Sequence, residues 1–312
     1  MKKVIFIAGP TAVGKTKYAI EIAKAFQGEI ISADSMQIYK YMDIGSAKPS
    51  REEQTQAKHY LVDEIDPRDE FSAAEYQMLA KQYIEQVFQK GMTPVVSGGT
   101  GLYLNSLIYD MDFSVMPKQS DLRRELTQEA ERFGPAHVHN RLKMLDPAAA
   151  ERIHPNNLKK VIRAIEVYEK TGEGVRAFKE SFIPTRDYGC ILIGLNRDRE
   201  ELYRRIDQRV DLLMKAGLVK EIEGLLKKGL TENSISMKGI GYKEIIGYLH
   251  GDYDLEEAVR LVKRNTRHYA KRQLTWLRRY PNMIWFDLSG SASEEKELSS
   301  ILETIRRELA AK

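Results

Sequence analysis

Apolar runs alternate with amphipathic stretches along the first third of the chain. Short runs rich in β-branched residues predict strands at 2–8, 29–33, 59–65 and 93–97. Between them the periodicity is helical, and Ser72 with Glu75 predicts a capping box for a helix that ends near Gly91. Strand, helix, strand repetition with this spacing predicts a parallel sheet with right-handed crossovers and helices on both faces.

The pattern changes near residue 118. From there to about residue 186, apolar positions recur at helical spacing over 120–133, 135–145 and 156–171, and no strand is predicted. Strand patterns return at 188–195 and 283–288, with a helix capped by Asp198 and a long basic helix (254–280) between them. We therefore expect an α/β core domain formed by 1–117 and 187–312, and an all-helical insertion domain at 118–186.

The segment after the first strand has the Walker A, or P-loop, pattern G-x-x-x-x-G-K-[ST]. It consists of Gly9, Pro10, Thr11, Ala12, Val13, Gly14, Lys15 and Thr16. The glycines allow a tight turn that brings backbone N–H groups and a helix N-terminus to one anion. Lys15 adds a point charge, and the Thr16 hydroxyl is a candidate ligand for Mg2+. The pattern predicts a P-loop NTPase-like sheet with a phosphate or diphosphate site, without deciding whether a phosphoryl group is transferred or only held.

Two further strand ends are expected beside this loop, because ligands of parallel sheets bind beyond the carboxyl ends of the strands. They are 34–37 and 97–101, so we predict one cleft formed by three segments. A Walker B strand is represented only by the short run that ends at Asp63. Asp34 is therefore the best candidate for an acidic residue beside the phosphate site, although an aspartate at a strand end is more often a turn or cap residue.

The composition is that of a globular protein and not of a membrane-spanning or disulfide-rich one. The 312 residues are 42% hydrophobic, which suffices for globular cores, and no apolar run is long enough to cross a bilayer. No signal peptide is predicted before the first strand, and the single cysteine, Cys190, excludes a disulfide framework and a cysteine-rich zinc site. We expect a cytoplasmic protein.

The net charge of +4 is mild, but basic residues gather on one predicted helix. Between residues 260 and 279 there are eight lysines and arginines and no acid: Arg260, Lys263, Arg264, Arg267, Lys271, Arg272, Arg278 and Arg279. The same helix carries His268, Tyr269, Trp276 and Tyr280. This combination favours a nucleic-acid surface over a merely solvated face.

Seven segments resemble, in order, the motifs of the tRNA dimethylallyltransferases, also called tRNA isopentenyltransferases. They are GPTAVGKT, ISADSMQIYKYMDIGSAKPS, VVSGGTGLYL, RAIEVYEKTG, RVDLLMKAGLVKE, KGIGYKE and TRHYAKRQLTW. The resemblance extends over nearly the whole chain. It is to the bacterial type, because the cysteine and histidine zinc element that eukaryotic relatives append is missing.

This resemblance implies transfer of a five-carbon group from dimethylallyl diphosphate to N6 of adenosine 37, beside the tRNA anticodon. The P-loop would hold the diphosphate as a leaving group, with Mg2+ on Thr16. Asp34 would be the general base, Thr100 would approach the adenosine, and Arg209 is a candidate for the diphosphate. We expect neither a membrane nor a second subunit to take part.

The resemblance also implies contacts with the tRNA anticodon stem-loop. In the core these would come from Asp34, Ser35, Met36, Gln37 and Thr100. In the insertion they would come from Arg123, Leu158, Lys159, Lys160, Val161 and Ile162. The chain has Asn-Leu-Lys-Lys at 157–160 where the family commonly has Asp-Pro-Gln-Arg, so bidentate hydrogen bonding is lost there although charge is kept.

Three other functions remain open from the residues. An adenylate isopentenyltransferase has a similar core, but free nucleotide requires neither the insertion nor the basic helix. A nucleotide or shikimate-type kinase would turn over the γ-phosphate of ATP without RNA. An RNA-binding module with a P-loop that only senses nucleotide would need no general base.

Overall fold

The computed structural model describes residues 2–111, 113, 121–175, 182–290 and 294–311. The chain forms two compact units, one of Met1–Ile108 with Arg186–Lys312 and the other of Tyr109–Thr185. The predicted boundary between residues 117 and 118 lies outside the described residues. None of the helices in the described part of the chain combines the length and apolarity needed to cross a membrane.

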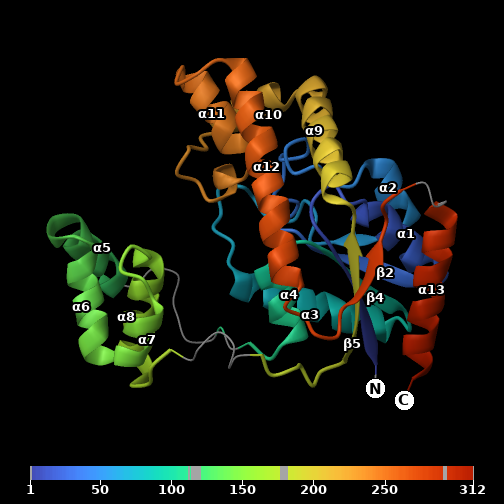
Figure 1. Cartoon of the computed structure of the whole chain (residues 1–312), viewed down its shortest axis with the longest axis horizontal. Coiled ribbons are helices and arrows are strands. Elements are labelled where there is room, and N and C mark those ends of the chain that lie inside the picture. Colours follow the sequence, from blue (N-terminus) through green and yellow to red (C-terminus); the bar gives the residue numbers. More distant parts are fainter. Residues whose placement is uncertain (1, 112, 114–120, 176–181, 291–293, 312) are drawn as a thin grey trace. The chain divides into compact units, whose positions relative to one another are not determined.

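The larger unit is built on one parallel six-stranded sheet (Figure 1). Its strands are β1 (Lys3–Ala8), β2 (Gly28–Ala33), β3 (His59–Tyr60), β4 (Thr93–Gly98), β5 (Gly189–Asn196) and β6 (Ile284–Asp287). They lie in the order β3-β2-β4-β1-β5-β6, and every neighbouring pair is parallel. The predicted α/β fold is confirmed. The prediction of a strand over 59–65 is too long, because Leu61 and Asp63 both have a φ of 58°, which turns the chain out of the extended conformation.

Helices cover both faces of this sheet. The helices of this unit are α1 (Lys15–Ala25), α2 (Arg51–Gln56), α3 (Ala73–Gln89), α4 (Gly101–Ile108), α9 (Arg199–Ala216), α10 (Leu218–Lys227), α11 (Tyr242–His250), α12 (Leu255–Leu277) and α13 (Glu294–Ala310), with a 3-10 turn at Ser236–Lys238. The capping box of Ser72 and Glu75 at α3 is present, and Asp198 caps α9, as predicted. α1 packs against β1, β2 and β4, with α13 beside it against β5, and α3 also packs on β2 and β4.

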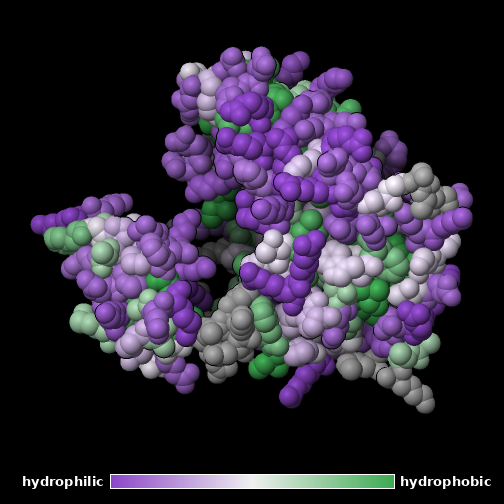
Figure 2. Space-filling view, in the orientation of Figure 1, coloured by the Kyte–Doolittle hydropathy of each residue, from purple (hydrophilic) through white to green (hydrophobic). Residues whose placement is uncertain are grey.

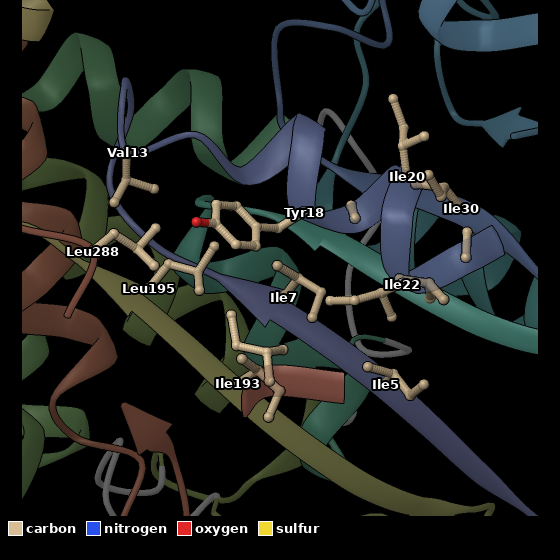
Figure 3. Packing of buried hydrophobic residues seen from close by; sticks show 14 of the residues in the cluster. Ile5, Ile7, Val13, Tyr18, Ile20, Ile22, Ile30, Ile193, Leu195 and Leu288 are labelled. Atoms are coloured by element: carbon tan, nitrogen blue, oxygen red, sulfur yellow. The ribbon is translucent and has the colours of Figure 1, made fainter. Parts of the chain in front are cut away.

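The core beneath α1 explains why the strands are continuous apolar runs (Figure 3). Ile5 and Ile7 of β1 and Ile193 of β5 are fully buried against Ile22 of α1. Because helices cover both faces, residues on both sides of each central strand must be apolar. Cys190 lies in β5 as a free thiol, and burial raises its pKa to about 12.

Over 121–175 the smaller unit consists of helices joined by short connections, without a strand in these described residues, as predicted. It contains α5 (Asp121–Phe133), α6 (Pro135–Leu145), α7 (Pro147–Arg152) and α8 (Leu158–Thr171). Its own apolar cluster includes Leu126 from α5, Leu142 from α6 and Ile165 from α8. The short helix α7 was not predicted; it begins where Asp146 accepts a hydrogen bond from the Ala149 N–H at 2.9 Å.

Candidate active site

The loop between β1 and α1 presents backbone N–H groups at the carboxyl end of the sheet. Ala12 and Gly14 have φ angles of 64° and 111°, and left-handed residues in such a loop turn successive N–H groups toward one point. α1 has neither a side-chain cap nor an acid in its first turn, so its first N–H groups are left for an anion. Gly9 is required by β5, since a Cβ there would lie 2.7 Å from the Leu195 carbonyl oxygen.

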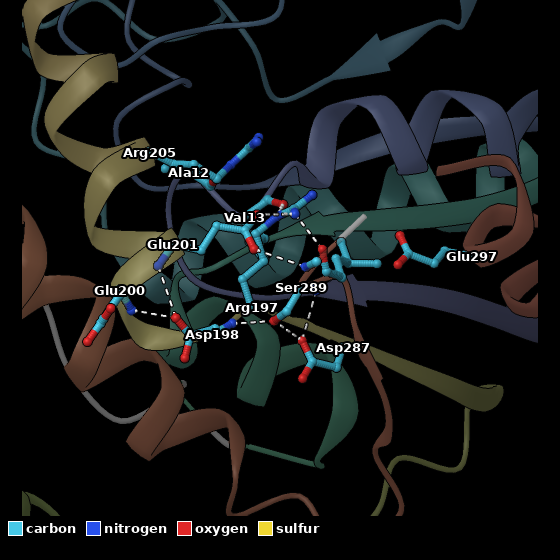
Figure 4. A network of polar contacts seen from close by, with 12 residues as sticks. Ala12, Val13, Arg197, Asp198, Glu200, Glu201, Arg205, Asp287, Ser289 and Glu297 are labelled. Atoms are coloured by element: carbon cyan, nitrogen blue, oxygen red, sulfur yellow. Dashed lines mark hydrogen bonds and ion pairs between the residues drawn. The ribbon is translucent and has the colours of Figure 1, made fainter. Parts of the chain in front are cut away.

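Two arginines hold this loop from behind (Figure 4). The buried Arg197 donates from Nε to the Val13 carbonyl oxygen at 3.1 Å and pairs with Glu201 at 2.5 Å. Arg205 donates from Nε to the Ala12 carbonyl oxygen at 3.0 Å. Arg197 follows β5 and Arg205 belongs to α9. Because both arginines bind carbonyl groups of the loop, these two elements hold the loop in place. The arginines were not predicted as site residues, and their role depends on contacts between distant segments.

A pocket of about 240 Å3 lies in front of the loop. Thr11, Ala12, Gly14, Lys15 and Thr16 line it, whereas Gly9, Pro10 and Val13 are buried behind it. Asp34, Ser97 and Gly98 line the same pocket from the ends of β2 and β4. The predicted convergence of three strand ends on one cleft is confirmed.

A second cavity of about 450 Å3 adjoins this pocket, and its lining combines an apolar wall with the cations Arg209, Lys238, Lys243 and Arg272. Its wall includes Ile206, Val210 and Leu213 of α9, Val262 of α12, and Ile235 and Ile240 of the segment before α11. Thr11, Asp34, Arg209 and Tyr269 line both spaces. A phosphate-sized polar pocket and an apolar cavity therefore meet at the carboxylate of Asp34.

Backbone contacts fix Asp34 and Thr100, two of the three predicted catalytic residues, although Thr100 lines neither the pocket nor the cavity. The Met36 N–H donates to Asp34 Oδ1 at 2.9 Å, which leaves the second carboxylate oxygen for another partner. The Ser35 N–H donates to Thr100 Oγ1 at 3.1 Å, and the Thr100 N–H donates to the Ala33 carbonyl oxygen at 3.1 Å. The ends of β2 and β4 are thereby tied together, and Asp34 and Thr100 lie on neighbouring turns.

The pocket carries two cations close to the P-loop. The pKa of Lys15 is lowered to about 8: burial is the main cause, Arg209 acts in the same direction, and the carboxylate of Asp34 acts in the opposite direction. Burial also lowers the pKa of Arg209, against the raising effect of Asp34. Taking cations out of water is unfavourable without an anion, so this pair favours a negatively charged ligand in the pocket.

The donors present fit a magnesium ion that is shared with a diphosphate. The Thr16 hydroxyl and the carboxylates of Asp34 and Glu53 line the pocket. Nowhere in the described chain do three or more histidine, cysteine, aspartate or glutamate side chains gather as a metal site. Mg2+ keeps waters and phosphate oxygens in such sites and takes few protein ligands, which this donor set permits.

Gln273 and Tyr269 of α12 are site residues whose function sequence reasoning missed. Gln273 lines the phosphate pocket, and Tyr269 lies between the pocket and the cavity. Burial and, to a smaller extent, the nearby Asp34 raise the pKa of Tyr269 to about 12. The sequence did contain one indication of this role. Tyr269 and Gln273 are four residues apart, which places them on one side of an otherwise basic helix.

The apolar cavity is closed by a loop that Glu221 of α10 holds. The Glu221 carboxylate accepts hydrogen bonds from the N–H groups of Asp43, Ile44 and Gly45 at 2.6–3.0 Å. The Tyr242 hydroxyl donates to the same carboxylate at 2.9 Å. A Cβ on Gly45 would lie 2.5 Å from the Tyr242 ring, so glycine permits this packing. These contacts join three of the sequence motifs noted above, those at 31–50, 209–221 and 238–244.

The prediction that α12 has unpaired cations is wrong for part of the helix. Arg260 pairs with Glu257, Lys263 with Asp211 at 2.6 Å, and Arg267 with Asp207 at 2.5 Å. Glu257 lies one turn before Arg260, and Asp207 and Asp211 lie on α9. These acids are therefore outside residues 260–279, on which the prediction was based. In the described chain, Arg264, Lys271, Arg272, Arg278 and Arg279 have no carboxylate within 4.0 Å. Hydrophilic residues cover the region of α9, α11 and α12 in Figure 2.

The aromatic residues of α12 also differ from the prediction. Trp276 Nε1 donates to Asn105 Oδ1 at 3.3 Å, and the Tyr280 hydroxyl bonds to the same oxygen. Tyr280 is buried in this packing against α4 and is not part of a surface, whereas Trp276 stays half-buried. His268 is exposed, as a surface contact requires.

The predicted tRNA contacts outside the cleft differ in accessibility. Lys159 and Lys160 are exposed at the start of α8, whereas Val161 and Ile162 are buried in the core of the helical unit. Arg123 donates to the buried Glu166 at 2.5 Å. In this segment, the two lysines therefore present their side chains to solvent, and the two apolar residues hold the first turn of α8 in place.

Known proteins share this architecture over the full chain. The family model described as IPP transferase matches residues 37–280. A tRNA dimethylallyltransferase of Alkaliphilus oremlandii is 54% identical over 98% of this chain and 97% of the relative. One from Acetivibrio thermocellus is 53% identical over 96% of both. The chain belongs to the tRNA dimethylallyltransferase family.

Solved structures of this family agree with the fold. The tRNA isopentenylpyrophosphate transferase of Bacillus halodurans is 41% identical, with a TM-score of 0.76 over 99% of this chain and 97% of that one. A eukaryotic dimethylallyltransferase described as acting on tRNA is 29% identical, with a TM-score of 0.86 over 99% of this chain and 79% of that one. As a tRNA dimethylallyltransferase by family, the protein is a prenyltransferase with a P-loop-like fold.

Proposed function

We propose that this prenyltransferase transfers a dimethylallyl group from dimethylallyl diphosphate to N6 of adenosine 37 in tRNA. The observation that supports it best is the junction at Asp34, where a cationic phosphate pocket meets an apolar cavity. A diphosphate fits the pocket, a five-carbon chain fits the apolar side, and a base can accept a proton between them. The relatives that are named for this reaction align with the whole chain.

The P-loop stabilises the leaving group. As the allylic C–O bond breaks, its electron pair moves to the diphosphate, and negative charge grows on the oxygens near Lys15 and Arg209. The N–H groups of the loop and of the first turn of α1 point to the same place. When bound on Thr16, Mg2+ supplies further charge neutralisation. No phosphoryl group is transferred, so the loop needs no partner that activates water.

Asp34 serves as the general base. The lone pair of the adenine amine is delocalised into the ring, so N6 attacks well only as its proton is removed. The N6 lone pair forms the new C–N bond, and the proton passes to Asp34. One carboxylate oxygen is held by the Met36 N–H at 2.9 Å, which orients the other. Thr100, tied to the Ser35 N–H, is positioned to approach the adenosine.

The target base must leave the stacked anticodon loop to reach this junction. We propose that Ser35, Met36 and Gln37 contact the extruded nucleotide and its neighbours. Lys159 and Lys160 at the start of α8 would bind phosphates of the stem. For Val161 and Ile162, which are buried, a contact would come from the backbone of the same turn.

The kinase alternative lacks its acidic partner. β3 ends at Tyr60, and the Asp63 carboxylate forms an ion pair with Lys48. Asp63 is also absent from the lining of the phosphate pocket. We further propose that the protein acts as a monomer, in the cytoplasm where tRNA is modified.

The test is a transfer assay with purified protein, Mg2+, dimethylallyl diphosphate and unmodified tRNA. Nucleosides from digested RNA are analysed by mass. We expect adenosine with one added five-carbon unit, and none when position 37 carries another base. Product on free AMP or ATP but not on tRNA would indicate an adenylate isopentenyltransferase, and binding of tRNA without any product would contradict the proposed activity.

A further inference from the structure

The Gln273 side chain joins the P-loop to the strand end that carries Thr100. Its Oε1 accepts a hydrogen bond from the Thr11 N–H at 2.8 Å, and its Nε2 donates to the Gly99 carbonyl oxygen at 3.0 Å. The residue is only 5% exposed. One amide on α12 thus satisfies a donor of one loop and an acceptor of the other.

The fit around this amide is close. A Cβ on Gly99 would lie 2.2 Å from Gln273 Nε2 and 2.9 Å from the Gly9 carbonyl oxygen. The two loops and the glutamine are therefore packed without room for a side chain at position 99. A small shift of the P-loop at Thr11 is felt at Gly99, because close-packed groups transmit displacement.

The contact continues to the acceptor side of the site. Gly99 precedes Thr100, whose hydroxyl accepts from the Ser35 N–H at 3.1 Å. The Tyr269 hydroxyl, one turn before Gln273 on α12, lies beside the Thr100 side chain. Ser35 follows Asp34 directly. Thr11, on the diphosphate side, is thereby connected to the residues proposed to receive the adenosine.

We propose that Gln273 is a positioning residue that couples occupation of the P-loop to binding of the acceptor RNA. A diphosphate that binds the loop orders the backbone at Thr11, which the arginine contacts to Ala12 and Val13 do not hold directly. That order fixes the Gln273 amide, which holds Gly99 and hence the Thr100 turn in the geometry that receives the base. Coupling of this kind is reciprocal, so bound RNA also raises the affinity for diphosphate. The inference rests on the proposed function, because it takes tRNA as the acceptor.

Magnesium pyrophosphate and a fluorescent anticodon stem-loop RNA with adenosine 37 test this directly. The dissociation constant of the RNA is measured by anisotropy with and without saturating pyrophosphate. For the wild type we expect pyrophosphate to tighten RNA binding by about fivefold or more, within the usual range of coupling between two sites. For Gln273→Met the factor falls below about twofold, since the side chain keeps its length but loses both hydrogen bonds.

Two further variants keep the test decisive. Gln273→Glu retains an acceptor for the Thr11 N–H, replaces the donor to Gly99 by an oxygen that repels the Gly99 carbonyl group, and adds a negative charge to the phosphate pocket. Because the coupling factor compares RNA affinities with and without saturating pyrophosphate, a weaker pyrophosphate affinity does not enter it, and this variant tests the coupling if the methionine variant does not fold. Gln77→Met is the matched control: Gln77 Nε2 donates to the Ser106 carbonyl oxygen at 2.8 Å, between α3 and α4, and the wild-type coupling factor is expected there.

The outcomes distinguish a coupling role of Gln273 from a role in stability alone. A merely structural role lowers the unfolding temperature and both separate affinities, and leaves the coupling factor unchanged. An unchanged factor in both Gln273 variants overturns the inference. If pyrophosphate does not alter RNA binding to the wild type, the inference also falls, whereas the proposed function is tested independently by prenyl transfer.

Discussion

The Lys15 ammonium donates a hydrogen bond to the Pro10 carbonyl oxygen at 2.8 Å. The two residues lie near opposite ends of the P-loop, so the side chain folds back over its own loop. Burial lowers the pKa of this ammonium to about 8, and the guanidinium of Arg209 adds to the effect. A diphosphate that binds here gives Lys15 an anionic partner and stabilises its charged form.

We therefore predict that pyrophosphate affinity falls as pH rises through the pKa of Lys15. The free site loses the proton near pH 8, whereas the complex retains it to higher pH. Affinity is then nearly constant below about pH 7 and declines toward tenfold per pH unit above about pH 8. Calorimetric titration with magnesium pyrophosphate measures the profile.

The Lys15→Met variant supplies the control for this profile, since pyrophosphate itself titrates. Dividing the wild-type affinity by that of the variant at each pH removes the contribution of the ligand. A ratio that does not change between about pH 7 and pH 9 would contradict the assignment of the inflection to Lys15.

Replacing Asp34 by Asn separates proton acceptance from binding. The amide keeps the size and the hydrogen bond from the Met36 N–H but cannot accept the N6 proton. We expect kcat to fall by roughly 10²–10⁴-fold, with pyrophosphate affinity unchanged or higher because a nearby negative charge is lost. Single-turnover transfer on tRNA measures the rate. Asp43→Asn, which removes an exposed carboxylate paired with Lys48, is the control, and equal rates in both variants would exclude Asp34 as the base.

Glu221→Gln tests the loop that closes the apolar cavity. An amide presents an NH2 group to backbone donors that now face a carboxylate, so at least one of them loses its acceptor. We expect a loss of about 2–3 kcal/mol in the free energy of unfolding, typical of hydrogen bonds to charged groups, measured by urea denaturation. Glu223→Gln, at an exposed position of the same helix, should leave stability within about 0.5 kcal/mol. Equal stabilities would show that the three N–H groups find other acceptors.

Lys271 and Arg272 lie on different sides of α12, because Arg272 lines the apolar cavity and Lys271 lines a recess beside Arg278. We predict that replacing both by alanine weakens tRNA binding and reduces its salt slope by about one to two units, with little effect on pyrophosphate binding. Filter binding over a salt series gives the slope. Arg260→Ala should not change it, since Arg260 is already paired with Glu257. An unchanged slope in the double variant would place both residues on a face that RNA does not touch.

Much of the fold follows from local patterns. The capping box of Ser72 and Glu75 and the cap at Asp198 depend on residues three positions apart, which the chain brings together by itself. The buried strands are recognisable as short apolar runs, and their spacing implies parallel pairing. The length of the third strand was overestimated, because the hydrophobic pattern does not indicate the left-handed conformations of Leu61 and Asp63.

The pairing of surface charges could not be predicted in this way. Lys263 and Arg267 had no acid within their own segment, but Asp211 and Asp207 of α9 lie beside them in the folded chain. Which cations stay unpaired depends on the rotation of α12 and on its neighbour. The inward direction of Trp276 has the same origin, since only packing against α4 decides it.

The amino-acid sequence alone determined the P-loop, the strand ends beside it and the acidic residue at their junction, because motif spacing and the rules of parallel sheets constrain these positions locally. Tertiary structure decided what holds and connects them. Arg205 with Ala12, Glu221 with Gly45 and Gln273 with Thr11 are each far apart in sequence. Such contacts form only when helices pack, and burial then sets both their strength and the pKa of Lys15.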